Sequence, residues 1–190
     1  MKILVLDNYD SFTYNLVYLL RELGFGDRLT VARNNKIQLD EISIFDKILI
    51  SPGPGLPESA GILKELISEY CKSKSILGIC LGHQGIAEVF GAQLYNMDEV
   101  LHGIPDEINV LDPKEILFKG LPGTFKACHY HSWTVQRESI NGELHVTAVD
   151  SEDRIMAITH TKYDVKGLQF HPESILTMDG LRIIDNWVNN

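Results

Sequence analysis

A cysteine stands between two glycines in the segment Gly78-Ile79-Cys80-Leu81-Gly82, at the end of an apolar run. This is the G-x-nucleophile-x-G spacing of a nucleophile elbow, with cysteine in place of serine. Small flanking residues let the chain turn sharply from strand to helix, and the N–H groups and dipole of the helix N-terminus favour a thiolate. Cys80 is therefore the predicted nucleophile. The alternative is a buried structural cysteine, the commoner state of a free cysteine.

A cysteine nucleophile needs a base and a group that orients the base, since an unperturbed thiol with a pKa of about 8.5 is mostly protonated at neutral pH. The segment His171-Pro172-Glu173 can supply both. Pro172 biases His171 toward an extended conformation, in which residues two apart point to the same side. The sequence thus predicts a catalytic triad of Cys80, His171 and Glu173. The alternative is a chance His-Pro-Glu in a surface turn.

An acyl transfer also needs hydrogen-bond donors for the oxyanion that develops on the carbonyl oxygen. The elbow places the backbone N–H of Leu81 for this role. Gly53, in the segment Pro52-Gly53-Pro54-Gly55, is the predicted second donor, because a glycine lets the backbone approach a substrate closely. The alternative is that this segment is only a rigid turn.

Strands alternate with helices in the first half of the chain. Apolar runs at Ile3–Leu6, Leu29–Ala32 and Ile48–Ile50 precede the elbow strand, and helical periodicity follows three of these strands. This pattern predicts an α/β fold with a mostly parallel sheet. Asp7, the Pro-Gly-Pro-Gly segment and Cys80 would then meet, because the carboxyl ends of parallel strands share one edge.

From about residue 93 to residue 170 short β-prone runs alternate with turn signals, which predicts hairpins or a curled antiparallel extension. Its expected strands are Ile108–Val110, Phe125–Tyr130, Leu144–Val149, Ile155–Thr159 and Gly167–Phe170. A helix is expected over Met178–Val188. With no linker or repeat, residues 1–190 are expected to form a single domain.

Composition excludes several classes of function. The formal charge of −9 argues against nucleic acid as a partner. Three widely spaced cysteines, Cys71, Cys80 and Cys128, suit a reducing compartment better than a disulfide framework. No signal peptide or membrane span is evident, so a cytoplasmic location away from membranes is expected.

Two further segments are candidate binding sites. His129 and His131 alternate in a β-prone run, but two histidines without a carboxylate cluster do not make a convincing metal site, and no metal is predicted. Residues 8–15 could be read as a phosphate-cradling loop that opens a helix, as in flavin binding. That segment lacks glycine, and the resulting expectation is that the chain carries no cofactor.

Taken together, the motifs resemble those of the class I (triad-type) glutamine amidotransferases, over the whole chain and in family order. They are Asn8-Tyr9-Asp10-Ser11-Phe12-Thr13, Ser51-Pro52-Gly53-Pro54-Gly55, Gly78 to Gln84, and Phe170-His171-Pro172-Glu173-Ser174. The first of these, with Tyr130-His131-Ser132, is similar to the branch that serves anthranilate synthase and para-aminobenzoate (aminodeoxychorismate) synthase.

The resemblance implies a flavodoxin-like open sheet with helices on both faces, and a glutaminase that converts L-glutamine to glutamate and ammonia. It implies that Gly53, Pro54, Gly55, Gln84, Ser132 and Trp133 hold the substrate. The implied partner is the large chorismate-binding synthase subunit, which would receive the ammonia. Tyr9 and Asp10 are candidate docking residues.

Three positions depart from the pattern, namely Cys128, Trp133 and Ile104, where the family often has Arg, Leu and Lys. None belongs to the triad, but they leave the substrate pocket, the partner surface and the choice of pathway open. Two alternatives also remain: another cysteine-elbow hydrolase of the same superfamily, and a non-catalytic binding subunit.

Overall fold

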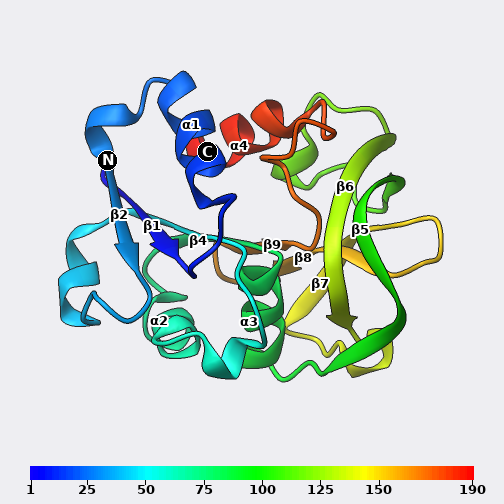
Figure 1. The fold of residues 1–190 in the computed structure, drawn as a ribbon, viewed down its shortest axis with the longest axis horizontal. Coiled ribbons are helices and arrows are strands. Elements are labelled where there is room, and N and C mark those ends of the chain that lie inside the picture. Colours follow the sequence, from blue (N-terminus) through cyan, green and yellow to red (C-terminus); the bar gives the residue numbers. More distant parts are fainter.

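One nine-stranded sheet, in the order β2-β1-β3-β4-β9-β8-β7-β5-β6, organises the computed structural model (Figure 1). The structure describes the backbone of residues 1–190 and all side chains except those of residues 98–102 and 104, so Ile104 lies outside the described side chains. The strands are β1 (Ile3–Asp7), β2 (Leu29–Arg33), β3 (Lys47–Ile50), β4 (Ser75–Ile79), β5 (Leu94–Val110), β6 (Thr124–Val135), β7 (Leu144–Val149), β8 (Ile155–His160) and β9 (Val165–Leu168). The helices are α1 (Thr13–Glu22), α2 (Leu63–Tyr70), α3 (Leu81–Val89) and α4 (Gly180–Val188), with short 3₁₀ turns between elements.

The predicted parallel part of the sheet is confirmed. β1 pairs in parallel with both β2 and β3, and β3 pairs in parallel with β4. β1, β3 and β4 are almost continuous apolar runs because both of their faces are covered, whereas the edge strand β2 is partly exposed. The carboxyl ends of β1, β3 and β4 therefore share one edge of the sheet. Asp7 is the last residue of β1, Ser51 follows β3, and Cys80 follows β4.

Helices cover both faces of the parallel strands, as the family resemblance implies. Alternate residues of β1 enter different cores: Ile3 and Val5 pack with α1 and α4 on one face, whereas Leu4 and Leu6 pack with α2 and α3 on the other. The α1–α4 layer and the α2–α3 layer lie above and below the sheet in Figure 1. β1 is thus buried on both faces, as a central strand of a parallel sheet should be.

The antiparallel extension is confirmed for β5, β6, β7 and β8, which pair antiparallel to their neighbours. The prediction for Gly167–Phe170 needs correction, because the strand there, β9, pairs antiparallel with β8 but parallel with β4. β9 thus joins the extension to the parallel strands. Its pairing with β4 carries the residues after Leu168 to the elbow.

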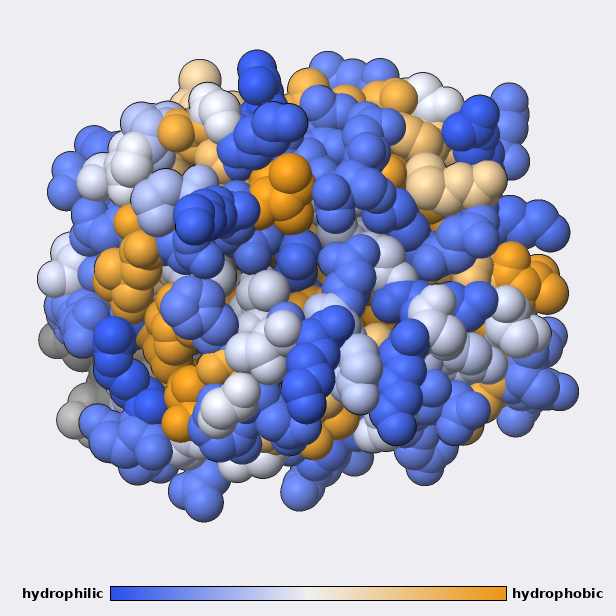
Figure 2. Space-filling view, turned by 180° about the vertical axis from the view of Figure 1, so that it is seen from behind, coloured by the Kyte–Doolittle hydropathy of each residue, from blue (hydrophilic) through white to orange (hydrophobic). Residues whose placement is uncertain are grey.

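The predicted last helix begins later than expected, at Gly180 rather than Met178. No helix among the described residues is long and apolar enough to cross a membrane. On the face shown in Figure 2 polar side chains predominate and apolar ones lie in small groups.

Candidate active site

The strand-to-helix turn at Cys80 has the strained backbone of a nucleophile elbow. β4 ends at Ile79, Cys80 has φ +50° and ψ −99°, and α3 begins at Leu81. A non-glycine residue at positive φ costs about 1–3 kcal/mol and persists only where the surrounding structure enforces it. Here the Cys80 N–H donates to the Leu168 carbonyl in β9 at 2.7 Å, and its carbonyl accepts from the Gln84 N–H at 3.0 Å.

The two flanking glycines are required because the chain passes very close to itself. A Cβ on Gly78 would lie 2.4 Å from the carbonyl carbon of Gly82, and one on Gly82 would lie 2.9 Å from the Ile50 carbonyl oxygen. Contacts this short cannot be accommodated without a backbone shift. The glycine spacing in the sequence therefore reflects the packing of α3 against β4 and β3.

Gly53 packs directly against the elbow. A Cβ at this position would meet the Asn8 Cβ and the Leu81 Cδ2, each at 2.6 Å. The expected meeting of three strand ends is thus observed. No hydrogen bond to a described residue engages the backbone N–H of Gly53 or of Leu81. Both predicted oxyanion donors are consequently free to bind a ligand.

His171 and Glu173 are in contact, but not through the extended conformation that the sequence predicts. Residues 172 and 173 form a turn, closed by the Ser174 N–H, which donates to the His171 carbonyl at 3.2 Å. Pro172 suits the second position of such a turn because its φ is already fixed. His171 Nδ1 donates to Glu173 Oε1 at 2.6 Å, and both side chains are buried.

Cys80 and Glu173 are the two neighbours that control the pKa of the His171 imidazole. Burial lowers the pKa of His171, but Cys80 and Glu173 outweigh it and raise the pKa to about 10. His171 Nε2, the nitrogen remote from Glu173, makes no regular hydrogen bond to a described residue. A base of this kind commonly tightens its geometry only when substrate binds.

A cavity of about 360 Å³ opens above Cys80. It is lined by Gly53, Pro54, Gly55, Cys80, Gln84, Tyr130, His131, Ser132 and Trp133. All six residues that the resemblance implies for substrate binding therefore line one cavity with the predicted nucleophile. Its size suits a ligand of amino-acid dimensions.

Three residues of this region were not predicted. Gln169 is fully buried and its Nε2 donates to Cys80 Sγ at 3.6 Å. Tyr130 packs its ring against that of His171, with ring centroids 4.9 Å apart, and Phe12 packs against Tyr130. Phe12 and Tyr130 belong to motifs that carry the family resemblance, although no role at the site was predicted for them. For Gln169 the one signal was a lone glutamine within the apolar run Leu168-Gln169-Phe170, which is unusual for a buried strand end.

His129 and His131 bind each other instead of forming part of a larger ligand cluster. His129 Nδ1 lies 3.2 Å from His131 Nε2, and His131 Nδ1 lies 3.0 Å from the Trp133 carbonyl oxygen. Among the side chains that the structure describes, no group of three or more His, Cys, Asp or Glu residues is arranged for a metal ion. His131 lines the Cys80 cavity, and His129 lies behind it as its hydrogen-bond partner.

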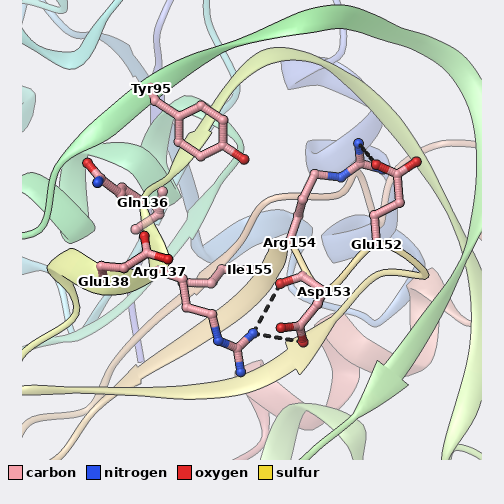
Figure 3. A pocket seen from close by; sticks show the side chains of 9 residues that line it. Tyr95, Gln136, Arg137, Glu138, Glu152, Asp153, Arg154 and Ile155 are labelled. Atoms are coloured by element: carbon pink, nitrogen blue, oxygen red, sulfur yellow. Dashed lines mark hydrogen bonds and ion pairs between the residues drawn. The ribbon is translucent and has the colours of Figure 1, made fainter.

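A second cavity of about 470 Å³ lies between β5, β6 and the turn before β8, and includes Tyr95, Arg137 and Arg154 (Figure 3). None of its residues lines the Cys80 cavity. Arg137 is paired with Asp153 at 2.9 Å and Arg154 with Glu152 at 3.0 Å. Because both guanidinium groups already contact carboxylates, this cavity offers no unpaired positive charge to an anion.

Comparison with known proteins identifies the family. Residues 4–190 match the family described as glutamine amidotransferase class-I. "Aminodeoxychorismate/anthranilate synthase component 2" of Bacillus subtilis is 45% identical over 188 residues, which cover 98% of this chain and 95% of that protein. "Anthranilate synthase component 2" of Cyanophora paradoxa is 45% identical over 190 residues, which cover 98% of each. A crystal structure from Thermoplasma acidophilum, described as that of a GMP synthase subunit, superposes with a TM-score of 0.88 at 26% identity, and the match covers 100% of this chain and 92% of that one.

Proposed function

Because the chain belongs to the class I glutamine amidotransferases, we propose that it is the glutaminase subunit of a chorismate-aminating enzyme. It hydrolyses L-glutamine to glutamate and ammonia and delivers the ammonia to a large chorismate-binding synthase subunit. The observation that carries this proposal is the cavity of about 360 Å³ that Cys80 shares with Gly53, Gln84 and Trp133. The names of the relatives support the chorismate branch of the family.

In the first half of the proposed reaction, the Cys80 thiolate attacks the side-chain amide carbon of glutamine and a C–S bond forms. The N–H groups of Gly53 and Leu81 bind the oxyanion that develops on the amide oxygen. The His171 imidazolium then gives its proton to the amide nitrogen, the C–N bond breaks, and ammonia leaves. Glu173 holds Nδ1 of His171 and stabilises its positive charge, as the carboxylate of a triad does.

In the second half, water attacks the γ-glutamyl thioester while the now neutral His171 takes up a water proton. The C–S bond breaks, glutamate leaves, and the sulfur departs as the thiolate. The cycle thus restores the starting thiolate and imidazolium. Residues 1–190 act as one domain in this proposal, and the balance of atoms and electrons needs no cofactor on this chain.

The test of this function is affinity labelling with a diazoketone analogue of L-glutamine. We expect one equivalent of reagent, located by peptide mapping at Cys80, with protection by L-glutamine and none by D-glutamine. Cys71→Ser is the matched control, because Cys71 lies at the end of α2, contacts the Ser68 carbonyl and does not line the Cys80 cavity, so its loss should leave the labelling intact. Labelling at another residue, or at Cys80 without protection by L-glutamine, would indicate a different cysteine hydrolase. Labelling without any glutamate production in the complex would indicate a non-catalytic role.

The partner is expected to dock next to the triad, over the segment that follows Glu173. Ile175 is 91% exposed and Met178 is 86% exposed, although both are large and apolar. Ser174 stands at the start of this segment, and its Oγ lies 3.4 Å from the hydroxyl oxygen of Tyr130. The ring of Tyr130 packs on His171. An apolar cover at this point would also keep ammonia from water, where it would become ammonium and lose its nucleophilic lone pair.

Ile175→Glu is therefore expected to weaken binding of the large synthase partner. Burying an isoleucine side chain contributes about 1.5–3 kcal/mol, so we expect the dissociation constant to rise about 10- to 100-fold. Binding is measured by titration calorimetry, with diazoketone labelling of Cys80 as a check on the site. Ile44→Glu is the matched control, since Ile44 is 61% exposed. Ile44 precedes β3 and so lies at the amino ends of the parallel strands, whereas Cys80 lies at their carboxyl ends. Equal weakening by both variants would contradict this docking surface.

A further inference from the structure

A chain of hydrogen bonds connects the wall of the cavity to the sulfur of Cys80. Gln84 Nε2 donates to the Trp133 carbonyl oxygen at 2.9 Å and to Gln169 Oε1 at 3.3 Å. Gln169 Nε2 in turn donates to Cys80 Sγ at 3.6 Å. Gln84 and Gln169 are both buried, at 3% and 0% exposed. Each amide therefore depends on these contacts for its hydrogen bonds.

The chemistry of the partners fixes the direction of every bond in this chain. The Trp133 carbonyl can only accept, so Gln84 must turn its NH₂ group toward it. The second N–H of Gln84 then faces Gln169, which must offer its oxygen. The NH₂ group of Gln169 is left pointing at the sulfur. If Gln169 turned over, two donors would meet at Gln84 and an oxygen would face the thiolate.

The hydrogen bonds of His129 and His131 are consistent with this orientation of the Gln84 and Gln169 amides. The Trp133 carbonyl also accepts from His131 Nδ1. A neutral His131 that is protonated at Nδ1 has a lone pair on Nε2, and this lone pair accepts from His129 Nδ1. Burial, with a smaller contribution from the neighbouring His129, lowers the pKa of His131 to about 3. The cavity wall is thereby held in one hydrogen-bonding pattern at neutral pH.

We propose that Gln169 is a further catalytic residue, which donates a hydrogen bond to the Cys80 thiolate and is held in the donating orientation by Gln84. The inference rests on the proposed function for its place in the reaction. The donor stabilises negative charge on sulfur at two stages: in the free thiolate before attack, and when the C–S bond of the thioester breaks and the electron pair returns to sulfur. Gln84 and His131 act through Gln169 and the Trp133 carbonyl as positioning residues.

The test is the pH profile of alkylation of Cys80 by iodoacetamide, followed by peptide mapping on the full chain. A hydrogen bond to a charged group is worth about 10- to 100-fold in an equilibrium constant. In Gln169→Met, which keeps the volume but removes the donor, the midpoint of the profile should move upward by about one to two pH units. The ultraviolet absorbance of the thiolate should move with it, and the kcat for glutamine should fall while KM changes less.

Gln136→Met is the matched control, because the same substitution is made in the other cavity (Figure 3), where no side-chain hydrogen bond of Gln136 is found among the described residues. Its profile should superimpose on that of the wild type. His171 faces the same sulfur and is unchanged in all of these variants, so it contributes equally to each profile. Gln84→Met should shift the midpoint in the same direction, and the double variant should shift it no further than Gln169→Met alone.

A folded Gln169→Met protein whose profile coincides with that of the wild type would overturn the inference. If Gln169→Met does not fold, the wild type still decides: alkylation of Cys80 should shift the NMR signal of the Gln169 side-chain amide more than that of Gln136. Equal shifts of the two amides would overturn the inference. Iodoacetamide is not a glutamine analogue, so the pH profile tests the role of Gln169 separately from the proposed function. If the profile shifts in Gln169→Met but L-glutamine does not protect Cys80, the role of Gln169 stands and the proposed function is contradicted.

Discussion

Glu173→Gln is expected to lower the kcat for glutamine hydrolysis by about 10³- to 10⁴-fold, as loss of the orienting carboxylate does in other triads. The amide is almost isosteric and can still contact His171 Nδ1. It carries no charge, however, and so cannot stabilise an imidazolium. Because an amide can also donate, it allows the tautomer in which Nδ1 accepts and the proton sits on the wrong nitrogen for the reaction. Steady-state glutamate production measures the effect.

The same variant should change how stability depends on pH. The folded-state pKa of His171 is raised to about 10, above the value of about 6.5 expected in an unfolded chain. A raised pKa stabilises the fold fully below about pH 6.5, and this contribution is lost as pH rises through about 10. Removing the Glu173 charge lowers the folded-state pKa. The stability that the variant loses should therefore be largest near pH 6 and should shrink toward pH 10, as followed by urea unfolding.

Glu138→Gln is the control for both measurements, because Glu138 is exposed and lies in the other cavity. It should leave kcat and the pH dependence of stability unchanged. If Glu173→Gln retained kcat within a few-fold, the carboxylate would have no orienting role, and the triad would reduce to a cysteine–histidine pair.

The elbow and the parallel strands could be predicted because their signals are local. Gly78, Cys80 and Gly82 lie within one turn of chain, and the glycines are required by contacts within that turn and with the adjacent β3. Similarly, β1, β3 and β4 are apolar on both faces, which a sequence shows directly. Once these strands are parallel, their carboxyl ends must share an edge. The proximity of Gly53 to Leu81 follows from that geometry.

The pairing of β9 could not be predicted in the same way. The run from Gly167 is short, and nothing local shows that it pairs in parallel with β4 as well as antiparallel with β8. The His171-Pro172-Glu173 segment shows a second limit. Proline is compatible with an extended chain and with the second position of a turn, and only the bond from Ser174 to His171 selects the turn.

The role of Gln169 depends on both of these features. β9 ends beside Cys80, so the residue after Leu168 faces the sulfur and the segment that follows carries His171 to the same place. The orientation of the Gln169 amide is set by Gln84 and the Trp133 carbonyl, which lie far away in the sequence. A network of this kind has no sequence signature beyond an isolated polar residue in an apolar run.

Cys80→Ser is expected to have the largest effect of any single substitution, a loss of about 10⁴- to 10⁶-fold in glutamine hydrolysis, comparable to removal of the nucleophile from a serine protease. A hydroxyl is far less acidic than a thiol, so serine offers no anion at neutral pH. The side chain is nearly the same size, and the fold should be retained. Ammonia, when supplied directly, needs none of the Cys80 chemistry.

The most direct measurement is therefore made on the purified complex of the Cys80→Ser chain with the proposed large synthase partner. Chorismate is supplied first with glutamine and then with ammonium at a pH that provides free ammonia, and the aromatic product is identified as anthranilate or aminodeoxychorismate. We predict that amination with glutamine disappears while amination with ammonia equals that of the wild-type complex. Amination with glutamine at the wild-type rate would contradict the assignment of Cys80 as the nucleophile that releases ammonia.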